Sequence, residues 1–113
     1  LSSAKEGEFD LKQDRGGVAD IEFLAQYWAL AHAATHPPVV HFPDTIRQLE
    51  SLASAALVPQ ETVDVLVHAY QRYRQVAHRR ALENQGNVLP AAEFAAGRAA
   101  VAAIWRETMG DPV

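Results

Sequence analysis

Residues 18–31 read VADIEFLAQYWALA and carry the clearest helical pattern in the chain. Apolar side chains recur there with the i, i+3, i+4 spacing that places them on one face of an α-helix. These residues are Val18, Ile21, Leu24, Ala25, Trp28 and Ala31. Phe23, Tyr27 and Leu30 widen the apolar face, so we expect a helix that is buried on more than one side. The helix should end before residues 36–38, HPP, because proline disfavours the helical conformation of the residue that precedes it.

Three more helices are predicted downstream, and each begins at a residue that favours a helix start. Asp44 is a typical N-cap, while Pro59 and Pro90 suit the first turn of a helix. The third helix should end in the turn-forming cluster at 84–87, and the fourth should end near Gly110. Connections of about three to eight residues favour an antiparallel four-helix bundle, which is an all-α fold.

The segments around these helices complete the expected organisation. Residues 1–8 are predicted to form a flexible lead-in, and residues 9–113 are predicted to form the helical domain. Residues 9–12, FDLK, alternate apolar and polar side chains and suggest a short strand or extended arm. Trp28 and Trp105 lie on the apolar faces of their helices, so both should be largely buried.

Composition excludes several classes of protein. The 113 residues include ten Lys and Arg against fourteen Asp and Glu, and this net negative charge disfavours nucleic acid and anionic membranes as partners. The chain has no cysteine, which excludes a disulfide scaffold, a cysteine zinc site and a thiol nucleophile. No apolar run approaches the ~18 residues of a membrane span. We therefore expect a soluble, cytoplasmic domain.

Two groups of polar residues lie on predicted helices. His32 and His36 are four apart, but the stretch HAATH lacks the glutamate of a zinc-protease helix, so no metal site is expected. A basic run follows on the third helix. It consists of Arg72, Arg74, His78, Arg79 and Arg80. It is either a solvated helix side or a contact for phosphate or an acidic partner, and spacing alone leaves both open.

Residues 12–17, KQDRGG, combine Lys12 and Arg15 with a glycine pair just before a helix start. Exposed amide groups at such a start can bind an anion. The alternative is a turn before a helix whose first residues include Asp20 and Glu22, as the helix dipole favours. These two acids are two positions apart and point in different directions on a helix, so they should not bind one metal together.

Several of these segments resemble motifs of bacterial glutamine synthetase adenylyltransferases. The first motif covers 9–12, 16–23 and 26–27, and the second is DTIRQLE at 44–50, similar to the family's D-N-I-R-x-L-E. Further matching positions are Tyr70, Tyr73, Arg74, His78, Arg79, Phe94, Arg98, Val101 and Trp105. Thr45 replaces an asparagine, and Ala19 stands where some members have arginine. The resemblance covers nearly the whole chain from residue 9 to residue 109.

This resemblance implies that the chain is one helical domain of a large enzyme with two halves. In each half a nucleotidyltransferase domain precedes a helical domain. The N-terminal half removes AMP from glutamine synthetase by phosphorolysis, and the C-terminal half transfers AMP from ATP to a tyrosine of that protein. The PII signal protein and glutamine control the balance. The form D-I-E-F at 20–23 and the short tail after the last helix favour the C-terminal, adenylylating half.

The resemblance also implies how the work is divided within the enzyme. The metal-binding aspartates belong to a G-S-D-x-D motif in the upstream nucleotidyltransferase domain, and this chain lacks that motif. ATP and Mg²⁺ are thus expected in the parent enzyme, with neither held by this chain's own residues. The isolated chain should be inactive. Its expected partners are the upstream domain, glutamine synthetase and the PII protein.

The leading hypothesis is an accessory domain that closes one side of the cleft for nucleotide and protein substrate. Candidates for nucleotide or phosphate binding are Lys12, Arg15, Gly16 and Gly17. Polar candidates that would face the cleft are Asp20, Glu22, Arg47, Arg74 and His78. Two alternatives are a regulatory bundle that docks glutamine synthetase or PII, and the related helical domain of a PII uridylyltransferase.

Overall fold

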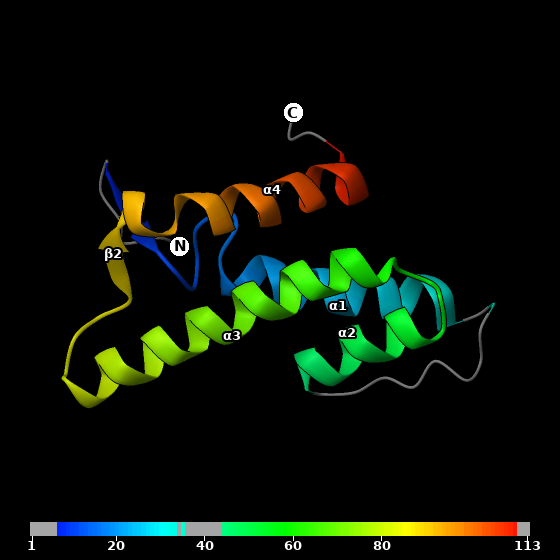
Figure 1. Cartoon of the computed structure of the whole chain (residues 1–113), viewed down its shortest axis with the longest axis horizontal. Coiled ribbons are helices and arrows are strands. Elements are labelled where there is room, and N and C mark those ends of the chain that lie inside the picture. Colours follow the sequence, from blue (N-terminus) through cyan, green and yellow to red (C-terminus); the bar gives the residue numbers. More distant parts are fainter. Residues whose placement is uncertain (1–6, 34, 36–43, 111–113) are drawn as a thin grey trace.

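The computed structural model describes residues 7–33, 35 and 44–110. The chain is mostly helical, as Figure 1 shows. Its elements are β1 (Glu8–Asp10), α1 (Val18–Ala33), α2 (Thr45–Ser54), α3 (Gln60–Leu82), β2 (Val88–Pro90), the 3₁₀ helix η1 (Ala91–Phe94) and α4 (Ala95–Met109). The four predicted helices are confirmed. Residues 1–6 of the expected lead-in, His36 and residues 111–113 lie outside the described residues.

Local sequence signals set the helix ends where they were expected. The Asp44 carboxylate accepts a hydrogen bond of 3.1 Å from the backbone amide of Arg47, so Asp44 is the N-cap of α2. Pro59 immediately precedes α3. Pro90 precedes η1, which leads directly into α4, and Gly110 ends α4 with a positive φ of 87°.

The all-α class needs a correction, because the chain also contains a two-stranded sheet. β1 pairs with β2 in antiparallel register, with Phe9 opposite Leu89. Both side chains are buried, and the Phe9 ring lies 5.7 Å from Tyr73 and 6.0 Å from Phe94 between centroids. The extended arm predicted at 9–12 is thus partly a strand, and its partner follows the end of α3. Burial of these aromatic rings holds the two short strands together.

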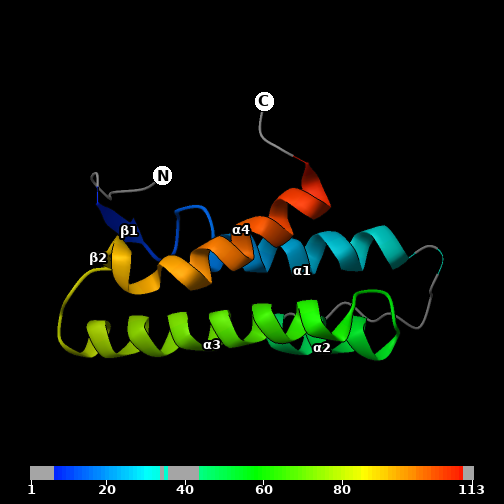
Figure 2. The same cartoon turned by 45° about the horizontal axis from the view of Figure 1, so that its top comes forward.

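The antiparallel four-helix bundle is not confirmed. In Figure 1, α1, α2 and α4 run in one general direction and α3 runs in the opposite direction. Figure 2 shows two layers, with α2 and α3 below and α1 and α4 above. Most of the connection between α1 and α2 lies outside the described residues. No helix among the described residues combines the length and the apolar character needed to cross a membrane.

One face of α1 enters the core and the other does not. Ile21, Leu24 and Trp28 are buried as predicted, whereas Leu30 is 74% exposed. Further exposed residues on α1 are Phe23 and Tyr27. The expectation of burial on more than one side of α1 is therefore wrong, because α2, α3 and α4 do not surround it completely.

Trp28 is buried as predicted, and Trp105 is partly buried where it packs against the core cluster. The Trp105 ring lies 5.2 Å from the Phe23 ring and 4.9 Å from the Arg15 guanidinium. Trp105 therefore packs at the edge of the interface between α1 and α4 instead of in the core.

Candidate functional site

The loop between β1 and α1 is tightly hydrogen-bonded. The buried Asp10 carboxylate accepts hydrogen bonds from the amides of Lys12 at 3.1 Å and Gln13 at 3.2 Å. The Asp10 amide donates to the carboxylate of Asp14 at 2.9 Å. The backbone amides of Asp10, Lys12 and Gln13 are thus held by aspartate side chains, a role that aspartate commonly has in turns.

Close packing explains the two glycines at the end of this loop. Gly16 has a φ of +84°, and a Cβ atom there would lie 2.6 Å from the carbonyl oxygen of Arg98. A Cβ atom on Gly17 would collide with the carbonyl oxygen of Leu11. Both contacts are too short for any side chain, so the start of α1 can approach Leu11 and α4 this closely only with glycine at both positions.

The amides at the start of α1 are engaged within the chain. The Gly16 amide donates to the Asp20 carboxylate at 2.7 Å, and the Gly17 amide donates to the Asp14 carbonyl at 3.0 Å. The Val18 amide donates to the Leu11 carbonyl at 2.7 Å. These are the groups that the sequence suggested for an anion, and here the loop itself supplies their acceptors.

Arg15 and Lys12 lie on different sides of this loop. The Arg15 guanidinium is 3.6 Å from the Asp20 carboxylate and lies over the ring of Trp105. The Arg98 side chain donates to the Arg15 carbonyl at 3.1 Å, which ties the loop to α4. Lys12 instead lines a hollow against α3.

That hollow brings together four of the polar residues predicted from the sequence. We call it the Lys12 hollow; its volume is about 350 Å³, and its lining includes Glu22 of α1 and both Arg74 and His78 of α3. Apolar side chains complete its wall. They are Leu11, Val18 and Ala77.

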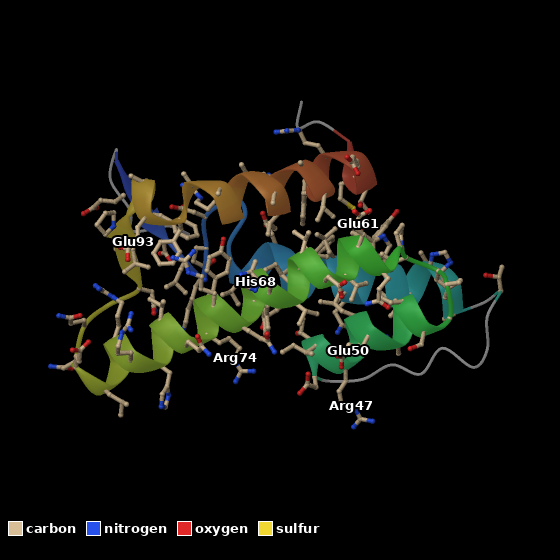
Figure 3. The ribbon with its side chains drawn as sticks, viewed as in Figure 1. Arg47, Glu50, Glu61, His68, Arg74 and Glu93 are labelled. Carbon is tan, nitrogen blue, oxygen red and sulfur yellow. The ribbon has the colours of Figure 1, made fainter. Side chains whose placement is uncertain are left out.

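A second hollow adjoins the first, because Arg74 and His78 line both. We call it the Gln71 hollow; its volume is about 460 Å³, and its other lining residues are Ile46 of α2 and Gln71 and Gln75 of α3. The two hollows together are named the Arg74 groove. Figure 3 shows the Arg74 side chain extending outward from α3, with Arg47 extending outward from α2 on the same side of the view.

A buried tyrosine fixes the carboxylate of this groove. The hydroxyl of Tyr70, itself buried, donates a hydrogen bond of 2.9 Å to the Glu22 carboxylate. Burial raises the pKa of Tyr70 above its ordinary value, and the neighbouring Glu22 raises that pKa as well. Tyr70 therefore remains a neutral donor at ordinary pH. Asp20 and Glu22 have different partners, because Asp20 accepts from the Gly16 amide and Glu22 accepts from the Tyr70 hydroxyl.

The basic run of α3 divides among several surfaces. Arg74 and His78 line the groove, while the Arg72 guanidinium lies 4.6 Å from the Phe94 ring. Arg80 donates hydrogen bonds to the carbonyl of Gly86 and, at 3.1 Å, to that of Val88. Arg80 thus supports the turn into β2, and the run is not one uniform basic face.

Sequence reasoning missed a third hollow of about 480 Å³ between α3 and α4. Its wall is mostly apolar and includes Tyr73, Phe94 and Gly97, with His68 and Arg72 among its polar residues. The small residues Ala96, Gly97 and Ala100 line this space, but only the packing of α4 against α3 reveals it. No group of three or more possible metal-ligating side chains occurs within 7–33, 35 and 44–110.

Comparison with known proteins gives a consistent family relationship. The model of the family described as GlnD PII-uridylyltransferase matches residues 2–103. Curated relatives include three bifunctional glutamine synthetase adenylyltransferase/adenylyl-removing enzymes. That of Thioalkalivibrio sulfidiphilus is 44% identical over 96% of this chain and 11% of the relative. That of Pseudomonas aeruginosa is 46% identical over 88% and 10%, and that of Nitrosococcus oceani is 41% identical over 98% and 12%. The chain thus spans about a tenth of the length of these relatives.

Proposed function

Because the chain belongs to the family described as GlnD PII-uridylyltransferase, we propose that it is an accessory helical domain of a nucleotidyltransferase. The proposed reaction is transfer of AMP from ATP to a tyrosine of glutamine synthetase. We favour this reaction over uridylyl transfer because the chain is 41–46% identical to relatives named as glutamine synthetase adenylyltransferases. The D-I-E-F form at 20–23 supports the C-terminal, adenylylating half.

Asp20 and Glu22, the two acids next to the glycine pair, do not fit a shared site for the Mg²⁺ that this chemistry requires. The Asp20 carboxylate accepts from the Gly16 amide, and the Glu22 carboxylate accepts from Tyr70 on another side of α1. The two acids cannot converge on one ion without breaking these hydrogen bonds. The proposal therefore places ATP and Mg²⁺ in the rest of the enzyme and gives this domain a role in binding and positioning.

The Arg74 groove is the surface that we propose to face the catalytic cleft. Lys12, Arg74 and His78 come from two separate segments and converge there on one hollow. Lysine and arginine groups in this arrangement attract an anionic ligand or protein segment. Gly16, Gly17 and the Arg15–Asp20 pair hold the loop that presents Lys12, and Arg47 extends the basic surface toward α2.

A second candidate function is that of a regulatory bundle that docks glutamine synthetase or PII. The exposed aromatic surface of Phe23 and Tyr27, next to Trp105, favours it, because large exposed apolar side chains often mark protein interfaces. In either case the partners are the upstream nucleotidyltransferase domain, glutamine synthetase and PII, in the cytoplasm.

The test measures AMP incorporation into glutamine synthetase. The isolated 113-residue chain, with ATP and Mg²⁺, is expected to give no incorporation above background. The full-length enzyme that contains it is expected to adenylylate glutamine synthetase and to lose that activity when this chain is deleted. Turnover by the isolated chain would refute the accessory role, and a full-length enzyme active only on PII would favour the uridylyltransferase alternative.

A further inference from the structure

The Arg74 groove is elongated and open, which suits an extended ligand. Its two hollows of about 350 Å³ and 460 Å³ share Arg74 and His78. The groove therefore continues from the loop after β1, across α3, to the first turn of α2. Arg74 lies where the two hollows meet, so a ligand that fills both must pass this side chain.

The charges in the groove disfavour a polyphosphate. Glu22 lines the same hollow as Lys12 and Arg74, and its hydrogen bond from buried Tyr70 prevents it from turning away. A nucleotide triphosphate would bring several negative charges next to this fixed carboxylate. A phosphate also favours free backbone amides at a helix start, and those of α1 donate within the chain.

The same residues suit a polypeptide segment. An acidic side chain can lie between Lys12 and Arg74, whose planar guanidinium pairs well with a single carboxylate. Glu22 can accept a hydrogen bond from a peptide amide or hydroxyl. Gln71 and Gln75 each offer both a donor and an acceptor, which matches a peptide backbone.

We infer that the Arg74 groove binds an extended segment of the protein substrate that carries an acidic residue. This inference rests on the proposed function, which supplies glutamine synthetase as that protein. In this arrangement Arg74 and Lys12 hold the acidic side chain, and Glu22 orients the adjoining peptide through one hydrogen bond. The groove sets the affinity for the protein substrate and leaves that for ATP to the catalytic domain.

The experiment separates the two substrates kinetically in the full-length enzyme that contains this chain. Arg74→Ala is expected to raise the KM for glutamine synthetase about tenfold or more, the effect of losing one charge-assisted contact, while the KM for ATP stays unchanged. Arg79→Ala is the matched control, because Arg79 is exposed on the same helix and lies outside the groove lining. It should change neither constant by more than about twofold.

Glu22→Gln discriminates between the two ligand classes. A peptide that donates to Glu22 should bind more weakly to this variant, which raises the KM for glutamine synthetase. A polyphosphate should bind more tightly, because the variant removes a repulsive charge, and the KM for ATP would then fall. Melting temperatures of all variants establish that they are folded.

The results separate this inference from the proposed function. If the unsubstituted enzyme does not adenylylate glutamine synthetase, the proposed function fails. If it does, and Arg74→Ala raises the KM for ATP or changes neither constant, the inference is overturned and the proposed function stands.

Discussion

The hydroxyl of Tyr73 donates a hydrogen bond of 2.9 Å to the carbonyl oxygen of Gly16, 57 positions earlier in the chain. Tyr73 is almost completely buried in the middle of α3, and Gly16 lies two residues before α1. A second long-range hydrogen bond joins Arg98 of α4 to the carbonyl of Arg15. The loop before α1 is thus a junction between the helices, which makes its backbone sensitive to substitution.

Gly16→Ala is expected to destabilise the fold by about 1–3 kcal/mol, because a Cβ atom at a φ of +84° is strained and meets the Arg98 carbonyl. Urea unfolding of the two proteins measures the difference. Gly97→Ala is the matched comparison, because Gly97 lies within α4. A Cβ atom there would be at an ordinary contact distance of 3.6 Å from the Tyr73 hydroxyl. That substitution should stabilise the fold by roughly 0.5–1 kcal/mol through helix propensity. Equal effects of the two substitutions would contradict the packing described for Gly16.

Tyr73→Phe should cost about 1–3 kcal/mol, because it leaves the carbonyl of Gly16 without this buried donor. The ring itself is kept, so its contacts with Phe9 and Phe94 remain. The unfolding free energy measures the loss. A change below a few tenths of a kcal/mol would mean that water or another donor replaces the hydroxyl.

Stability should fall in alkaline solution. Burial raises the pKa of Tyr70 and of Tyr73 above the ordinary value of 10.0. The unfolded chain then releases these protons at lower pH than the folded chain does. The contribution is fully present below about pH 10 and is lost as pH rises through the folded pKa. Unfolding measured from pH 8 to 11 checks this fall, and Tyr73→Phe should make it shallower. An unchanged slope in that variant would contradict the role of Tyr73.

Trp28→Ala should cost about 3–5 kcal/mol, the usual range for a large buried aromatic side chain. Trp105→Ala should cost less, roughly 1–2 kcal/mol, because Trp105 is only partly buried, at the edge where it meets the Phe23 ring and the Arg15 guanidinium. Thermal or urea unfolding of both variants gives the comparison. A larger loss for Trp105 would mean that the core extends farther toward α4.

Lys12→Ala is expected to reduce adenylylation by the full-length enzyme about ten- to a hundredfold, with a stability change under ~0.5 kcal/mol. Lys12 is exposed and lines the groove, so its removal leaves no cavity in the core. Arg15→Ala should have a smaller effect on activity, since Arg15 points toward Asp20 and Trp105. A loss of activity confined to Arg15→Ala would indicate that the α4 side of the loop faces the cleft.

Local signals predicted the helices, and non-local contacts account for what was missed. The Asp44 cap and the apolar face of α1 depend on residues a few positions apart, and both are present in the structure. β2 has three residues and one is proline, so it shows no alternation that could predict a strand. Its existence depends on pairing with β1.

The candidate site was likewise predicted only in part from the sequence. Motif residues identified Lys12, Glu22, Arg74 and His78, and the structure places these four in one hollow. The contribution of Gln71 was not predicted, because it depends on how α3 lies against α2. The exposure of Phe23 was also missed, since periodicity shows that a residue is apolar but not whether another element covers it.

Helix α4 buries few side chains, and this affects how the molecule unfolds locally. Val101 is the one buried residue among the fifteen of α4, whereas α1 and α3 each contribute five. Segments with few buried apolar contacts detach at lower free energy than the rest of a domain. Amide hydrogens of α4 should therefore exchange with solvent deuterium earlier than those in the middle of α1 and α3. Each such opening withdraws Arg98 from the carbonyl of Arg15 and uncovers the ring of Tyr73 without unfolding the remaining helices.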